Sequence, residues 1–173
     1  ADDADRMLDA GWYPAVKRCL DVAISLSAMA AFLPFLLLIA ALIYLDDPSG
    51  SPLFVQDRVG KNGRLFRFYK FRSMCVNADR MLDGLLDQNE ADGPAFKMRN
   101  DPRVTRIGRW LRKCSLDELP QLYNILKGDM SLVGPRPERP FFVDQLTRDI
   151  PFYAVRHCVK PGVTGWAQVR YQY

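Results

Sequence analysis

Two adjacent acidic residues, Asp117 and Glu118, are the first candidates for chemistry in this 173-residue chain. Because proline is tolerated only in the first turn of a helix, Pro120 predicts a helix that begins close to Asp117. The positive end of the helix dipole would favour ionised carboxylates there, and paired carboxylate oxygens suit a hard cation such as Mg²⁺. A structural alternative stays open, because Ser115 and Glu118 have the spacing of a capping box.

Arginines surround this acidic pair in the sequence. They are Arg106, Arg109, Arg112, Arg136 and Arg139. A guanidinium group can bind two phosphate oxygens at once, so an acidic pair among arginines favours a site for a metal and a phosphate over a simple helix cap. The segment GPRPERP, which contains Pro135 and Arg136, is a second phosphate-binding candidate, because a loop of glycine and proline fixes its arginine. A plain rigid turn is the alternative for this loop.

A basic hairpin is the next candidate. The strand-like runs 53–58 and 65–71 flank a turn at residues 60–63, and alternation in the second run separates phenylalanines from basic residues. The hairpin region carries Arg58, Lys70 and Arg72. These three side chains could bind a substrate phosphate or contact anionic lipid headgroups, and the sequence leaves both outcomes open.

An uncharged run at residues 22–45 predicts a retained membrane segment. As a straight helix it would extend roughly 36 Å, which exceeds the roughly 30 Å hydrocarbon core of a bilayer. Pro34 lies near its middle and predicts a kink. Basic residues on both sides, including Lys17 and Arg18, fit poorly with a single crossing. A helix that bends at Pro34 and returns to the same face is one interpretation, and an ordinary kinked transmembrane helix is the other.

The rest of the chain predicts an α-rich α+β domain at a membrane surface. Helices are expected at residues 104–113 and 118–127, with a shorter one capped by Asn77. Lys17 and Asp21 are spaced for an ion pair on one helix face. Phe141, Phe142, Phe152 and Tyr153 are candidate interfacial residues on amphipathic segments, with core packing as the alternative.

Composition narrows the classes of partner. The net charge of +4 and the pI near 8.9 favour anionic partners. The four cysteines are scattered and there is one histidine, so we expect no zinc site and a reducing compartment. We also expect no nucleic-acid partner, because the basic residues surround carboxylates and accompany a membrane segment.

Four segments, taken in order, resemble the monotopic phosphoglycosyl transferases, a family of bacterial sugar transferases. They are KRCLD at 17–21, FVQDRVGKNGRLFRFYKFRSM at 54–74, RVTRIGRWLRKCSLDELPQLYNILKGDMSLVGPRP at 103–137 and KPGVTGWAQV at 160–169. Any one of them alone is a weak signal. Together, in this order, they are spread over residues 17–169 and are highly specific.

The resemblance implies transfer of a sugar-1-phosphate from a nucleoside-diphosphate sugar, with uridine as the nucleoside, to polyprenyl phosphate. This is the initiating step of exopolysaccharide or glycoconjugate synthesis. It implies a ping-pong reaction with Mg²⁺ as cofactor, in which Asp117 is the nucleophile and carries the sugar phosphate covalently. Glu118 would position the metal or assist deprotonation, while Arg112 and Arg136 would hold phosphate.

The resemblance also implies an organisation of the chain. Residues 1–16 would be a linker or the tail of a missing N-terminal region, residues 17–46 a re-entrant membrane helix broken at Pro34, and residues 47–173 a cytoplasmic catalytic domain that could be truncated at its C-terminus. The enzyme would lie in the bacterial inner membrane with this domain facing the cytoplasm. Small family members have Ser-Pro at the break, whereas this chain has Leu33-Pro34. Homo-oligomerisation stays open.

Two alternatives compete with this prediction. In the first, the same transfer occurs by direct attack of the lipid phosphate, and Asp117 and Glu118 only hold Mg²⁺. In the second, the chain is a non-enzymatic membrane adaptor that binds anionic lipid through its basic and aromatic residues.

Overall fold

The computed structural model describes residues 11–90, 96 and 98–170, which form two compact units. The first unit contains the described residues 11–33, 55–69 and 120–170, and the second contains those within 34–54 and 70–119. One long helix and one hairpin contribute residues to both units. The few short strands and many helices confirm the predicted α+β class.

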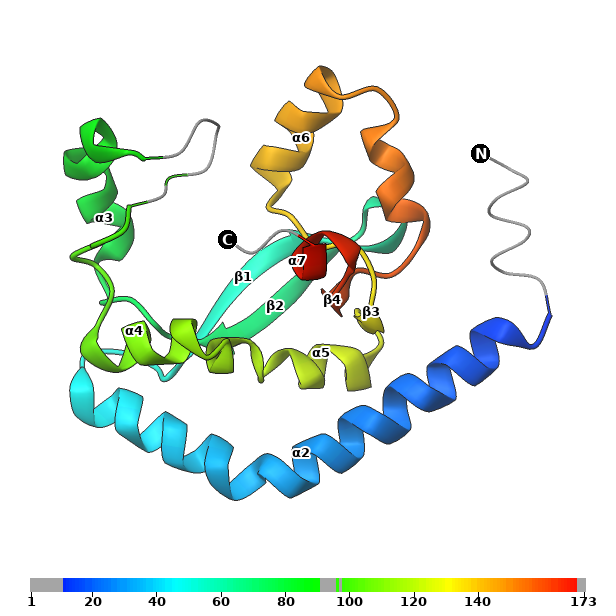
Figure 1. Cartoon of the computed structure of the whole chain (residues 1–173), viewed down its shortest axis with the longest axis horizontal. Helices are drawn as coiled ribbons and strands as arrows, with labels where there is room; N and C mark the ends of the chain where they lie inside the picture. Colours follow the sequence, from blue (N-terminus) through cyan, green and yellow to red (C-terminus); the bar gives the residue numbers. More distant parts are fainter. Residues whose placement is uncertain (1–10, 91–95, 97, 171–173) are drawn as a thin grey trace. The chain divides into compact units, whose positions relative to one another are not determined.

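The long helix is α2, Tyr13–Asp46, and it continues through Pro34 (Figure 1). Among the described residues it is the one helix long and apolar enough to cross a membrane, and little of its most apolar stretch is buried. A core helix of a soluble protein would have that stretch covered, so the exposure favours a membrane segment. Whether α2 crosses the bilayer or returns to the same face stays a prediction.

The predicted hairpin is present. It consists of two paired strands, β1, Leu53–Val59, and β2, Leu65–Phe71. The short 3-10 turn η1, Lys61–Gly63, connects them. In the first unit, Phe66 and Phe68 of β2 form a buried cluster with Ile125 and Met130. The alternation in β2, in which the sequence separates phenylalanines from basic residues, thus directs Phe66 and Phe68 into the core.

The remaining elements of the first unit follow helix α5, Gln121–Lys127. Strand β3, Ser131–Val133, pairs in parallel with β4, Gly162–Thr164 (Figure 1). Between these strands the chain forms α6, Pro140–Asp149, and the 3-10 helix η4, Tyr153–Cys158, and after them α7, Trp166–Arg170.

The first turns of α2 are tied to this unit by buried polar contacts. The predicted ion pair is confirmed, with Lys17 Nζ 2.7 Å from Asp21 Oδ1. Asp21 also accepts a hydrogen bond from the backbone N–H of Leu132 at 3.1 Å, and Lys17 donates to the hydroxyl of Ser131. The Arg18 guanidinium donates to backbone carbonyls at the end of α5. These contacts hold the start of the apolar helix against β3 and α5.

The second unit has its own apolar core, formed by Ile39, Ile43, Phe71 and Leu111. Its elements are α3, Ala78–Leu82, the 3-10 helix η2, Asp83–Gln88, α4, Arg106–Lys113, and the 3-10 turn η3, Leu116–Glu118. The predicted basic helix is α4, which begins two residues later than expected because Thr105 caps it. Asn77 stands at the N-cap of α3 as expected, although its side chain makes no cap hydrogen bond.

The exposure of two aromatic residues in and next to α6 and η4 contradicts the alternative that they pack in the core. Phe141 is 70% exposed and Phe152 is 87% exposed, so core packing is wrong for these two residues. Phe142 and Tyr153 are half-buried. Phe152 also has a positive φ of 61°, which is uncommon for a bulky side chain.

Candidate functional site

Asp117 lies in η3, between α4 and α5, and not at the start of an α-helix. Ser115 adopts the left-handed conformation, with φ 55°, and reverses the chain after α4. Short-range hydrogen bonds of the 3-10 type follow, and α5 begins only at Gln121, with Pro120 as its N-cap. The α-helix that was predicted to begin close to Asp117, at about residue 118, therefore begins later, at Gln121. The capping-box alternative is also wrong, because the side chain of Ser115 makes no cap hydrogen bond.

The Asp117 carboxylate is buried, with 9% of the residue exposed. Burial raises the pKa of Asp117 above its ordinary value, and the negative charge of Glu118 raises it further. The positive charges of Lys70 and Arg112 lower this pKa but do not cancel the rise. The second unit thus holds a poorly solvated carboxylate beside one like charge and two opposite charges. Perturbed carboxylates of this kind are concentrated at functional sites.

Arg112 reaches this cluster from the last turn of α4. Its Nε donates a 2.8 Å hydrogen bond to Ser73 Oγ, just after β2. The Ser73 carbonyl accepts a hydrogen bond from the Thr105 N–H at 3.2 Å, and Thr105 Oγ1 caps α4 by accepting from Gly108 N at 2.9 Å. Both ends of α4 are therefore fixed to the segment that follows β2.

Gly108 permits this close approach. A Cβ built on Gly108 would lie 2.0 Å from the Ser73 carbonyl oxygen and 2.6 Å from its carbonyl carbon. No side chain fits at that distance from backbone atoms. Glycine at this position therefore allows α4 to pack directly on the Ser73 backbone and to present Arg112 beside Asp117.

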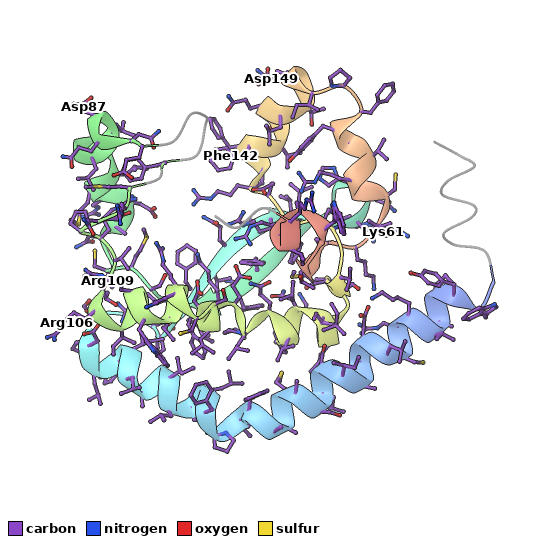
Figure 2. All side chains as sticks on the ribbon, viewed as in Figure 1. Lys61, Asp87, Arg106, Arg109, Phe142 and Asp149 are labelled. Carbon is purple, nitrogen blue, oxygen red and sulfur yellow. The ribbon has the colours of Figure 1, made fainter. Side chains whose placement is uncertain are left out.

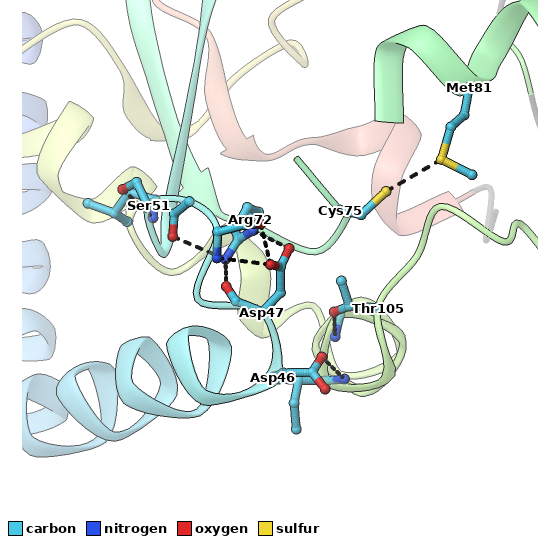
Figure 3. A network of polar contacts seen from close by, with 12 residues as sticks. Asp46, Asp47, Ser51, Arg72, Cys75, Met81 and Thr105 are labelled. Carbon is cyan, nitrogen blue, oxygen red and sulfur yellow. Dashed lines mark hydrogen bonds and ion pairs between the residues drawn. The ribbon is translucent and has the colours of Figure 1, made fainter. Parts of the chain in front are cut away.

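The other predicted basic residues of the second unit lie at the end of the hairpin. The Lys70 ammonium is 5.2 Å from the ring centroid of Phe54. Arg72 is buried and forms an ion pair with Asp47, and it also donates to the carbonyls of Asp47 and Gly50 (Figure 3). These contacts show that Arg72 holds the segment after α2. Its predicted contact with substrate stays a prediction.

The arginines that precede the acidic pair divide into two groups. The positive charge of Arg112 lowers the pKa of the Asp117 carboxyl group. Arg106 and Arg109 are exposed on α4 (Figure 2). Whether Arg106 and Arg109 contact a phosphate stays a prediction.

The predicted phosphate loop, GPRPERP at residues 134–140, belongs to the first unit and is held through its backbone. Gly134 N donates to the Thr164 carbonyl at 2.9 Å, and Gly162 N donates to the Pro135 carbonyl at 3.0 Å. A Cβ on Gly162 would lie 2.1 Å from Gly134 N, so the two backbones approach more closely than side chains would allow. The loop thus extends the β3–β4 pairing.

Two further arginines fix the loop from other elements. Arg156 of η4 donates to the Arg136 carbonyl at 2.7 Å, and Arg58 of β1 donates to the Pro137 carbonyl at 3.1 Å. Arg58 also lies 3.7 Å from a carboxylate oxygen of Glu138 and 5.3 Å from the centroid of the Phe68 ring. The backbone at Arg136 is therefore preorganised, as a phosphate-binding loop requires.

Three residues that hold the Asp117 cluster and the phosphate loop in place were not predicted from the sequence. Ser73 and Arg156 carry no local signal, because their partners lie far away in the chain. Gly108 did offer a signal: an isolated glycine inside a helical pattern often marks a close packing contact.

The donor set at the acidic pair can be compared with the needs of a metal. Among the described residues there is no group of three or more histidine, cysteine, aspartate or glutamate side chains that could hold an ion. Mg²⁺ is commonly held by one or two carboxylates together with water and substrate phosphates. Asp117 and Glu118 fit that mode, in which the substrate completes the coordination.

Comparison with known proteins places these residues in a family. The family model described as bacterial sugar transferase matches residues 12–173. The UDP-N-acetylgalactosamine-undecaprenyl-phosphate N-acetylgalactosaminephosphotransferase of Aeromonas hydrophila is 50% identical over 161 residues, which are 93% of this chain and 35% of that protein. The undecaprenyl-phosphate glucose phosphotransferase of Komagataeibacter xylinus is 45% identical over 161 residues, 91% of this chain and 28% of that protein.

A shorter relative is covered more fully. An exopolysaccharide production protein of Rhizobium leguminosarum bv. phaseoli is 44% identical over 161 residues, 90% of this chain and 74% of that protein. The chain thus spans about a third of the length of the first two relatives and about three quarters of the third. Because the family match covers nearly all of the sequence, the chain belongs to the bacterial sugar transferase family.

Proposed function

We propose that this chain transfers a sugar-1-phosphate from a uridine-diphosphate sugar to polyprenyl phosphate. One observation carries the proposal: a buried carboxylate of raised pKa, Asp117, lies under the influence of Arg112 and Lys70 in a member of the sugar transferase family. The names of the first two relatives specify undecaprenyl phosphate, and one of them specifies a UDP-sugar. In the cell, this transfer would be the first step in the synthesis of an exopolysaccharide or glycoconjugate.

The first half of the proposed reaction is attack by Asp117. One carboxylate oxygen forms a bond to the sugar-linked phosphorus of the donor, while the bridging P–O bond to the nucleoside monophosphate breaks. The nucleoside monophosphate leaves with the electron pair of that bond, and the sugar phosphate stays on Asp117. No proton needs to move in this step, which suits a carboxylate nucleophile.

In the second half, an oxygen of polyprenyl phosphate attacks the same phosphorus. The bond to Asp117 breaks, the carboxylate is restored, and a polyprenyl diphosphate sugar is released. In the transition state of each half, the transferred phosphoryl group carries negative charge that must be stabilised. Arg112, held by Ser73, is suited to stabilise this charge with its guanidinium group. A phosphate-binding role for Arg136 is a separate part of the proposal, and it rests on the preorganised backbone of its loop.

Burial of Asp117 contributes to the attack. A carboxylate that has lost much of its hydration is less stabilised in the ground state and so gains more from bonding to phosphorus. The cost of keeping it ionised is offset in part by Lys70 and Arg112. The cluster thus keeps an anion available without solvating it fully.

We propose Asp117 and Glu118 as the ligands of a Mg²⁺ cofactor. When bound, the ion would neutralise charge on the carboxylates and on the diphosphate of the donor. Burial raises the pKa of Asp117, and the negative charge of Glu118 raises it further, so a cation that compensates both carboxylates would be favoured here.

The stability of metal-free protein tests this arrangement. The pKa of Asp117 is raised above 3.8 in the folded chain, so its contribution to stability is complete below the unfolded pKa and is lost as pH rises through the folded pKa. Asp117→Asn cannot ionise, and it should raise the melting temperature at neutral pH in EDTA by about 2–4 °C for each kcal/mol recovered. The difference should vanish below about pH 4.

Thermal unfolding in nanodiscs, followed by tryptophan fluorescence, measures both effects. Added Mg²⁺ should stabilise the parent chain more than Asp117→Asn or Glu118→Gln. Equal stabilisation of all three would remove the acidic pair as the metal site, and an unchanged melting temperature in EDTA would show that burial of Asp117 carries no cost.

Incubation with donor alone tests the covalent step. We expect one equivalent of nucleoside monophosphate per active chain, released without acceptor, together with a sugar-phosphate adduct on the peptide that contains Asp117, found by mass spectrometry after acid quenching. Direct attack by the lipid phosphate predicts no release until acceptor is added. A membrane adaptor predicts no release in either case.

The membrane arrangement completes the proposal. We propose that α2 enters and leaves the bacterial inner membrane on the cytoplasmic side, with the break at Pro34. The basic residues on both flanks of the apolar run support this topology. The exposed Phe141 and Phe152 are suited to interfacial contact.

A further inference from the structure

A cavity of about 350 Å³ opens at the tip of the hairpin, within the first unit. Its lining comes from the hairpin turn, the end of α5 and the segment before β4. The residues are Gly60, Lys61, Asn62, Arg64, Leu65, Phe66, Gly128, Asp129 and Lys160. Lys61 lies at the tip of the hairpin (Figure 2). None of these residues belongs to the acidic pair, its basic neighbours or the phosphate loop.

Basic side chains converge on this cavity around Gly128. Gly128 ends α5 in the left-handed conformation, with φ 97°. A Cβ at this position would lie 3.6 Å from a guanidinium nitrogen of Arg18 and 3.8 Å from Lys160 Nζ. The two cations therefore lie on the same side of a helix end that carries no side chain. Lys61 and Arg64 approach from the hairpin.

Among the described residues, the basic side chains at this cavity are Arg18, Lys61, Arg64 and Lys160, and the acidic ones near Lys160 are Asp21 and Asp129. Burial lowers the pKa of Lys160, and the positive charges of Arg18 and Lys61 lower it further, while Asp21 and Asp129 oppose the shift. Both acids already have other partners, since Asp21 pairs with Lys17 at 2.7 Å and Asp129 with Lys127 at 3.0 Å. An added anion would relieve the repulsion among the cations.

The position of the cavity near the membrane helix indicates which kind of anion would bind there. Arg18 lies four residues before the uncharged run at 22–45 and is tied to the end of α5. A basic residue just outside the apolar part of a membrane helix lies at the level of the lipid headgroups. A phosphate ester held by Arg18, Lys61 and Lys160 would therefore be at that depth.

We propose that this cavity binds the phosphate of an anionic phospholipid headgroup and so anchors the first unit to the membrane surface. The chemistry recognised is a phosphate ester, and the membrane rather than the solution is its source. The site would hold the start of α2 and the hairpin tip against the same lipid. It does not depend on the proposed catalytic reaction.

Lysine footprinting of the whole chain in nanodiscs tests the proposal. Nanodiscs of phosphatidylcholine are prepared with increasing fractions of phosphatidylglycerol, and acetylation of Lys160 by a limiting reagent is measured by mass spectrometry. We expect labelling of Lys160 to fall as phosphatidylglycerol increases. Lys61→Gln should need about fivefold more phosphatidylglycerol for the same protection of Lys160, as loss of one basic residue near the surface predicts.

Two comparisons make the result decisive. Arg148→Gln removes an exposed charge from α6. If the cavity is a site, this variant should change the phosphatidylglycerol fraction needed to protect Lys160 by less than twofold. An equal change in Arg148→Gln and Lys61→Gln would mean diffuse attraction and would overturn the proposal. Inorganic phosphate is added to nanodiscs of phosphatidylcholine alone and should give little protection. Protection by phosphate but not by phosphatidylglycerol would overturn the membrane source, and no protection by either would overturn the site.

Discussion

Asp117→Asn is expected to slow nucleoside monophosphate release by about 10⁴-fold or more, the scale seen when a covalent nucleophile is removed. Asparagine keeps the shape of the side chain but supplies no carboxylate oxygen for attack on phosphorus. The buried position of Asp117 leaves little room for solvent to act in its place. The measurement is release from a UDP-sugar by the whole chain in nanodiscs, with Mg²⁺ and polyprenyl phosphate present.

Glu118→Gln is the matched control for Asp117→Asn. It also removes one negative charge from the pair and leaves the neighbouring carboxylate in place, so it should retain measurable release and form the adduct slowly. A loss of less than tenfold in Asp117→Asn, in a chain that melts at or above the temperature of the parent, would contradict a covalent role for Asp117. It would favour direct attack by the lipid phosphate, since a membrane adaptor would release no nucleoside monophosphate.

Gly108→Ala is expected to have the second largest effect. The new methyl group would lie 2.0 Å from the Ser73 carbonyl oxygen, so α4 must move away from the segment after β2. Overpacking of this kind costs about 1–3 kcal/mol of unfolding free energy. It also displaces Arg112, which is hydrogen-bonded to Ser73, and a misplacement of about 1 Å lowers transfer by about 100-fold.

Gly84→Ala provides the control for this prediction. A Cβ at Gly84, in η2 of the same unit, meets no atom within 4 Å. The substitution should leave transfer unchanged and alter stability by no more than about 1 kcal/mol, the difference in helix propensity between the two residues. Denaturant unfolding and the release assay measure both variants. If Gly108→Ala behaves like Gly84→Ala, the close packing on Ser73 does not position Arg112.

Local patterns in the sequence were sufficient for several elements. The alternation in β2 predicted that its phenylalanines are separated from its basic residues, and Phe66 and Phe68 are found in the core. The i, i+4 spacing predicted the ion pair of Lys17 and Asp21. The second predicted helix was correctly expected to end at residue 127, where Gly128 forms its C-cap. These features depend on residues within one turn or one strand, where side-chain direction follows from backbone geometry.

The surroundings of Asp117 were not accessible in the same way. The sequence predicted an α-helix that begins close to this residue, whereas a 3-10 turn follows the left-handed Ser115 and α5 begins only at Gln121. Helix ends depend on how the chain packs after the turn, and local propensity decides them poorly. The exposure of Phe141 and Phe152 was likewise open, because an amphipathic pattern does not say what covers its apolar face.

The sequence by itself determined the family, the apolar helix, the hairpin and the acidic pair, since each is written in contiguous residues. Only the tertiary structure decided that Asp117 is buried, that Arg112 is held by Ser73, and that Arg58 and Arg156 fix the loop of Arg136. These partners are separated by 20 to 79 positions in the chain. Contacts over such separations form only when packing of the whole unit compensates the entropy of closing the loops between them.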